Sequence, residues 1–131
     1  MKSSLLQVTL AALGGFLAWF LGGIDVYIYI LIIFVVCDYI TGIMKAISER
    51  KLSSKIGAKG IFRKALIFII IGLSNLIDEY VLRNNGMFRT ILVFFYISNE
   101  GISILENANV LGLPIPEKLK SFLLTLKDKP Q

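Results

Sequence analysis

The chain has 131 residues, 56% of them apolar, with a mean hydropathy of +0.75 and a formal net charge of +5. It is too apolar for an ordinary soluble domain of this length, and its apolar residues come in long runs. Its basic residues lie between these runs, which argues against a nucleic-acid-binding protein because membrane topology and anionic lipid headgroups account for them. We therefore expect an all-α integral membrane protein with one domain over residues 1–131, about four transmembrane helices and a C-terminal amphipathic helix.

The residues that carry most enzyme chemistry are scarce. The chain has no histidine and a single cysteine, Cys37, so it can form no internal disulfide. It also lacks a phosphate-binding glycine loop, a nucleophile elbow and any cluster with metal-ligand spacing. We expect no enzyme activity, no cofactor and no metal site, and we interpret Cys37 as a buried small apolar residue.

The first apolar run, residues 5–24, has about the 20 residues that a helix needs to cross a bilayer. A secretory signal peptide is the alternative, but the run exceeds the usual ~7–15 apolar residues and no convincing A-x-A cleavage site follows. We therefore expect a retained helix. Gly14, Ala18 and Gly22 recur at every fourth residue, a spacing that lets another helix approach closely, although a lipid-facing helix also tolerates glycine.

The second run, residues 26–47, contains an ionisable residue. Asp38, Thr41, Gly42 and Lys45 lie at i, i+3, i+4 and i+7, which places them on one helical face. An acid inside a membrane span is costly, so Asp38 is a candidate functional residue.

A basic segment over residues 48–62 leads to the third span, residues 63–77. Its serines and glycines predict an irregular loop or a short interfacial helix. The basic residues of this segment and of the start of the span are Arg50, Lys51, Lys55, Lys59, Arg63 and Lys64.

The fourth span, residues 87–106, is the least apolar of the four. At 100° per residue, one polar stripe runs along the helix. It consists of Arg89, Tyr96, Glu100, Ser103 and Asn107. Residues 114–131 then form a basic amphipathic segment suited to a membrane surface. The alternative is a soluble tail that packs on the protein's own loop.

Charge distribution predicts the topology. Loops rich in lysine and arginine stay on the cytoplasmic side, so four crossings place both termini and residues 48–62 in the cytoplasm. A version with three crossings, in which the first or fourth run lies in the interface, is the alternative.

Asp38 and Glu100 both fall in the cytoplasmic halves of their helices in this topology. They either pair with Lys45, Arg63 or Lys64 and lock the helices together, or face a polar, hydrated interior formed when several copies assemble.

Two blocks of sequence carry a family resemblance. DYITGIMKAISERKLSSKIGAKGIFRKALIFIIIG (38–72) and FFYISNEGISILENANVLGLPIPEKLK (94–120) resemble the two signatures of a phage holin family that includes the clostridial toxin-release holins. The matching signature positions are Asp38, Gly42, Lys45, Gly60, Lys64, Glu100, Ser103, Asn107, Pro114 and Pro116.

The resemblance implies a multi-span protein of the bacterial cytoplasmic membrane. Such a protein forms homo-oligomers in the lipid bilayer and opens lesions late in a phage lytic cycle. An endolysin, or in some relatives a toxin, then leaves the cytoplasm without needing direct contact with the holin.

Two other classes fit the bare sequence. A small ion-coupled transporter would use Asp38 or Glu100 as a proton site, but it predicts a broken helix or an inverted repeat, and the sequence shows neither. A membrane scaffold would recruit partners through the basic loop and tail.

Overall fold

The computed structural model describes residues 2–128, apart from the side chains of residue 123 and residues 126–128. The end of the predicted amphipathic segment, residues 129–131, lies outside this part. The helices are α1 (Lys2–Phe20), α2 (Val26–Ser48), α3 (Ser54–Leu76), a π-helical turn η1 (Ile77–Leu82), α4 (Met87–Val110) and α5 (Glu117–Asp128). Four of these segments, α1, α2, α3 with η1, and α4, are long and apolar enough to cross a membrane. The predicted all-α fold, four membrane helices plus a short C-terminal helix, is confirmed.

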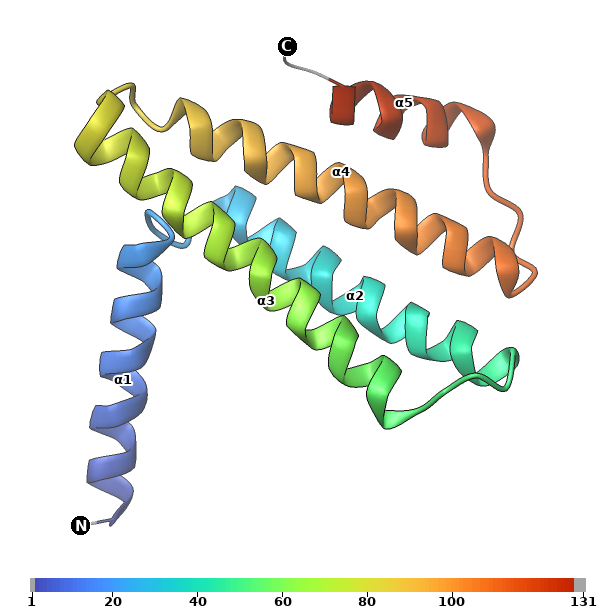
Figure 1. Cartoon of the computed structure of the whole chain (residues 1–131), viewed down its shortest axis with the longest axis horizontal. Coiled ribbons are helices and arrows are strands. Elements are labelled where there is room, and N and C mark those ends of the chain that lie inside the picture. Colours follow the sequence, from blue (N-terminus) through green and yellow to red (C-terminus); the bar gives the residue numbers. More distant parts are fainter. Residues whose placement is uncertain (1, 129–131) are drawn as a thin grey trace.

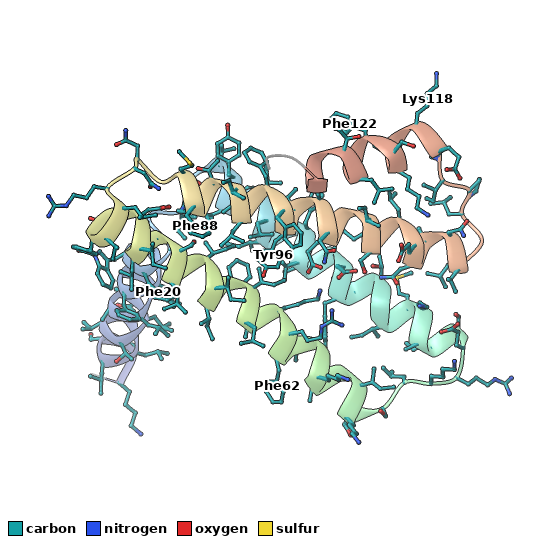
Figure 2. All side chains as sticks on the ribbon, turned by 45° about the horizontal axis from the view of Figure 1, so that its top comes forward. Phe20, Phe62, Phe88, Tyr96, Lys118 and Phe122 are labelled. Atoms are coloured by element: carbon teal, nitrogen blue, oxygen red, sulfur yellow. The ribbon has the colours of Figure 1, made fainter. Side chains whose placement is uncertain are left out.

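Helices α2, α3 and α4 form a bundle from which α1 is splayed away, while α5 folds back along α4 (Figure 1). The tail therefore packs on α4 and not on a loop. Lys118 and Phe122 of α5 point away from α4 (Figure 2). Whether α5 also binds a membrane surface stays a prediction.

Of the two structures expected for residues 48–62, an irregular loop or a short helix, residues 54–62 are helical and form the start of α3. The Ser53 hydroxyl accepts a hydrogen bond from the Ile56 amide at 3.1 Å and caps the helix. The connection therefore shrinks to residues 49–53, and α3 with η1 continues to Leu82.

The glycines of this segment do not break α3, because they receive a side chain from α2. The Tyr39 hydroxyl donates to the Gly57 carbonyl oxygen at 3.1 Å. A Cβ atom on Gly60 would lie 3.2 Å from the Tyr39 ring. Small residues therefore allow α2 and α3 to approach closely here.

The bundle interior has an apolar layer between polar clusters at its two ends. The buried apolar cluster lies toward the α1–α2 turn and comprises Leu21, Ile28, Leu31, Val35, Ile67, Ile71 and Val93. Further along the same helices most buried side chains are polar or charged, among them Asp38 and Glu100, and Ile102 is apolar. Because lipid is as apolar as these side chains, close packing and polar contacts, more than burial from water, hold such helices together.

Helix α1 contributes no buried residue and is attached at its C-terminal end. The Asn75 amide donates to the Phe20 carbonyl oxygen at 3.1 Å. The Phe20 ring occupies the space above Gly72, where an added Cβ atom would overlap the ring.

The small-residue positions predicted on the first helix divide between two environments. Gly14 lies on α1, with nothing within 4 Å of an added Cβ atom. Gly22 lies beyond the helix, in the α1–α2 turn, with φ at +82°, so the stripe on α1 is limited to Gly14 and Ala18. Their packing against a second helix stays a prediction.

Gly72→Ala is expected to destabilise the bundle by about 1–3 kcal/mol, because the new methyl group overlaps the Phe20 ring. An unfolding titration in detergent measures the effect. Gly14→Ala is the control, since its methyl group enters open space. Adding Phe20→Ala to Gly72→Ala should recover part of the loss, and a double variant that shows no coupling contradicts the predicted contact.

Candidate functional site

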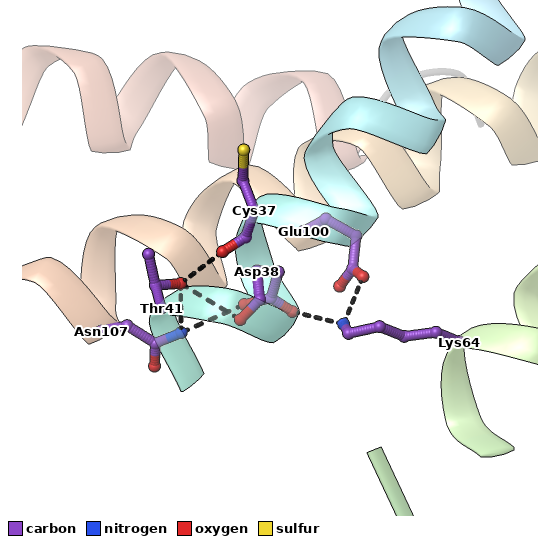
Figure 3. Close-up of polar contacts among 6 residues, drawn as sticks. All are labelled: Cys37, Asp38, Thr41, Lys64, Glu100 and Asn107. Atoms are coloured by element: carbon purple, nitrogen blue, oxygen red, sulfur yellow. Dashed lines mark hydrogen bonds and ion pairs between the residues drawn. The ribbon is translucent and has the colours of Figure 1, made fainter. Parts of the chain in front are cut away.

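A buried ionic network joins α2, α3 and α4 (Figure 3). The Lys64 ammonium reaches across from α3 and lies 2.7 Å from a carboxylate oxygen of Asp38 on α2. The same nitrogen lies 2.6 Å from a carboxylate oxygen of Glu100 on α4. Both acidic side chains are nearly inaccessible, at 9% and 5% exposure. One lysine therefore connects three membrane helices.

The second oxygen of Asp38 is also bonded. The Asn107 amide donates to it at 3.2 Å and to the Thr41 hydroxyl at 3.0 Å. Thr41 in turn donates to the Cys37 carbonyl oxygen at 2.9 Å. These bonds give the buried acid partners on each side, which a charge in a low-dielectric interior needs.

The Cys37 side chain itself takes no part in the network. It points away from the polar cluster in Figure 3 and is exposed on the bundle. Its interpretation as a buried residue is wrong, because one step along a helix turns a side chain by about 100° from the buried face that holds Asp38.

The network is not balanced in charge. Two carboxylates face a single ammonium group, so the cluster carries one excess negative charge when all three groups are ionised. Breaking a buried ion pair by removing one partner is strongly destabilising. Lys64 is therefore the residue on which the stability of the cluster depends most.

Two clefts flank the network. One, of about 190 Å³, lies between α2 and the start of α3 and is lined by residues that include Tyr39, Gly42 and Gly60. The other, of about 290 Å³, lies between α3 and α4 and is lined by residues that include Arg63 and Tyr96. Lys64 and Ser103 line both.

A second polar cluster lies at the opposite end of the bundle, next to the α1–α2 turn. Arg89 is buried, and its guanidinium group donates to the carbonyl oxygens of Leu21 and Gly23, the latter at 3.1 Å. It also pairs with Asp25 at 3.0 Å. Arg89 thus binds the carbonyl groups that follow α1, where a cation is favoured by the helix dipole.

The start of α4 is capped from a distance. Gly86 precedes the helix and has no side chain to cap it, and the Asp78 carboxylate accepts hydrogen bonds from the amides of Phe88 and Arg89 at 3.0 and 2.7 Å. Asp78 comes from η1, so the π-helical turn aims a carboxylate at the next helix.

Asp25 begins α2 and is partly exposed. Burial opposes its ionisation, but the hydrogen bond from the Ile28 amide and the pair with Arg89 hold the pKa of Asp25 below its usual value of 3.8. Because the pKa is lowered, its stabilising contribution is complete above pH 3.8 and is lost as the pH falls through the lowered value.

The structure brings together only part of the predicted site. Asp38, Lys64, Glu100 and Asn107 meet directly, and Gly42 lies beside the Asn107 amide. Arg89 belongs to the far cluster, Tyr96 and Ser103 line clefts, and Lys45 lines a separate cleft beside α5. The remaining basic residues, Arg50, Lys51, Lys55, Lys59 and Arg63, are exposed.

Asp25, Asn75 and Asp78 are structural residues that were not predicted as site residues, whereas Thr41 was placed on the helical face of Asp38 without a stated role. A usable signal for Asp78 is an acid at the end of an apolar span, followed by a helix whose first residues offer no cap. Over residues 2–128, no group of three or more Cys, Asp or Glu side chains is placed to hold a metal ion.

Comparison with known proteins agrees with the membrane fold. A family model described as the bacteriophage holin family matches residues 15–128. An uncharacterised 14.9 kDa protein of Clostridium perfringens is 42% identical over 120 residues, covering 92% of this chain and 91% of its own. A probable holin of Bacillus phage phi105 is 37% identical over 90 residues, covering 69% of this chain and 66% of its own.

No solved structure matches the chain. The family match covers most of the sequence, including both polar clusters, and four helices are long and apolar enough to cross a membrane. This chain is therefore a multi-pass membrane protein that belongs to the bacteriophage holin family.

Proposed function

We propose that this protein is a holin that forms homo-oligomers in the bacterial cytoplasmic membrane. The oligomers open lesions through which an endolysin, or a toxin, leaves the cytoplasm. The observation that carries the proposal is the buried network of Asp38, Lys64 and Glu100. Family membership favours a non-enzymatic role.

The network suits a protein that must first be harmless and then open. Within one chain, the polar face of α4 is turned toward α2 and α3, so Glu100 and Asn107 are hidden from lipid. If copies associate and the bundles separate, the same face can line water, where an ionised Glu100 is no longer penalised. Gly14 and Ala18 on the splayed α1 offer a surface for such contacts between copies.

We also propose that both termini and the α2–α3 connection are cytoplasmic. A cysteine at Met87, next to the connection between η1 and α4, should react with an impermeant thiol reagent in intact spheroplasts. A cysteine at Ser54 should not react. Both positions are exposed. The background is Cys37→Ser, because Cys37 is exposed too. Labelling at Ser54 and not at Met87 would contradict the proposed topology and indicate the opposite orientation.

Vesicle leakage separates the holin proposal from its two alternatives. Purified protein, reconstituted at rising density, is expected to release both a trapped small dye and a trapped protein the size of an endolysin. A transporter would pass ions and retain both cargoes, and a scaffold would leave the vesicles sealed. Retention of the protein cargo at every density contradicts lesion formation.

A further inference from the structure

The N-terminal half of α3 carries a row of basic residues that form no ion pair within residues 2–128. Lys55, Lys59 and Arg63 follow one another at intervals of four residues and therefore share a helical face. All three are exposed, and none forms an ion pair within the part of the chain that the structure describes. Lys64, the next residue along, faces the ionic network and is already bound.

The same face continues into an apolar groove. Leu66 and Ile70 lie below Arg63 along α3 and line the cleft of about 290 Å³ between α3 and α4. On the α4 side, Asn99 and Ser103 line this cleft, and neither side chain makes a hydrogen bond within residues 2–128. The cleft thus has polar groups free to bind a ligand at one end and apolar walls at the other.

The position of Arg63 along α3 matches a membrane interface. Helix α3 with η1 has 29 residues, which at about 1.5 Å per residue makes a rod of roughly 44 Å. The hydrocarbon core of a bilayer is only about 30 Å thick. If the first turns of α3 extend into the cytoplasm, Arg63 lies at the level of the phospholipid phosphates, with Leu66 and Ile70 at acyl-chain depth.

The charge of the site selects the ligand. Inside the cleft, Arg63 and Lys64 offset Asp38 and Glu100, so the cleft itself does not repel an anion. Lys55 and Lys59 add positive charge on the same helical face of α3, toward its N-terminus. We propose that this cleft binds one anionic phospholipid, with its phosphate on Arg63 and Asn99 and an acyl chain along Leu66 and Ile70.

Native mass spectrometry of the full chain in detergent, titrated with phosphatidylglycerol, tests the proposal. Arg63→Gln and Lys59→Gln are each expected to weaken retention of the first lipid about fivefold, the usual contribution of one basic residue at a membrane surface. Asn99→Ala should also weaken retention although it leaves the charge unchanged. Lys51→Gln, which removes the same charge from the connection outside this face, should change retention less than twofold.

Three results would overturn the site. Equal losses for Lys51→Gln and Arg63→Gln would mean diffuse attraction to a basic surface. Retention of phosphatidylethanolamine as strong as that of phosphatidylglycerol would remove the charge selection. If glycerol phosphate displaces phosphatidylglycerol at an equal concentration, the cleft binds a phosphate group and does not select a lipid. None of these readouts depends on lysis, so the lipid site and the holin function succeed or fail separately.

Discussion

Lys64→Gln is expected to destabilise the folded bundle by about 3–5 kcal/mol, the usual cost of removing one partner from a buried ion pair. The substitution leaves Asp38 and Glu100 facing each other without a cation between them. An unfolding titration in detergent measures the loss. In cells the same variant should accumulate poorly or lyse the host early, because the closed bundle is the state that it weakens.

Glu100→Gln is expected to have the opposite effect on timing. Glutamine keeps the shape and an oxygen that accepts from Lys64, and the remaining Asp38–Lys64 pair is neutral. The closed bundle of this variant loses its excess negative charge. Exposing residue 100 to water in an oligomer then lowers the free energy less than it does in the parent. We therefore expect normal insertion with delayed or absent lysis.

Glu106→Gln is the matched control for this prediction, because Glu106 is an exposed acid on the same helix. Lysis onset is compared at equal amounts of membrane-inserted protein. The Lys64→Gln/Glu100→Gln double variant restores the parent charge and should be less disturbed than Lys64→Gln alone. If Glu100→Gln lyses on the parent schedule, Glu100 is only a structural partner and has no switching role.

Arg89→Met is expected to loosen the attachment of α1 and to destabilise the protein by about 2–6 kcal/mol. The variant leaves the carbonyl oxygens of Leu21 and Gly23 without their donor, and each buried polar group left unpaired costs about 1–3 kcal/mol. The pair with Asp25 adds little, because that carboxylate is 42% exposed. Amide exchange in the α1–α2 turn should become faster.

Two comparisons make the Arg89 prediction specific. Arg83→Met removes an exposed arginine at the same end of the bundle and should leave amide exchange unchanged. The pH dependence gives a second check: with Arg89 gone, the pKa of Asp25 loses one cause of its depression, so the parent should lose more stability than the variant on acidification below pH 3.8. If amide exchange in the α1–α2 turn of the Arg89→Met variant is as slow as in the parent, the contacts of Phe20 and Asn75 are enough to hold α1 in place.

The inward face of α4 was predictable, because helical periodicity alone places Arg89, Glu100 and Asn107 on one side, and all three are buried. The identity of the cation was not. Lys45, Arg63 and Lys64 were equal candidates by sequence position, and only the packing of the three helices against one another selects Lys64. Tyr39 also packs against Gly57 and Gly60, a contact between helices that local sequence patterns do not predict.

The ends of the helices were less predictable than their membrane-spanning parts. Residues 54–62 contain glycines and charges typical of a loop, yet the Ser53 cap and contact with α2 make them helical. The cap of α4 by Asp78 joins residues about ten positions apart and requires the π-helical turn between them. Likewise, Phe20 packs on Gly72, which is far away in the sequence, and the spacing of glycines does not predict this contact.

The most direct test of the holin function is inducible expression in bacteria together with an endolysin that lacks its own export signal. Membrane potential, culture turbidity and endolysin outside the cytoplasm are followed over time. The predicted result is a delay, then loss of potential and escape of the endolysin, with lysis only when both proteins are present. Continued growth with the endolysin retained, while this protein accumulates in the membrane, would contradict the proposed function.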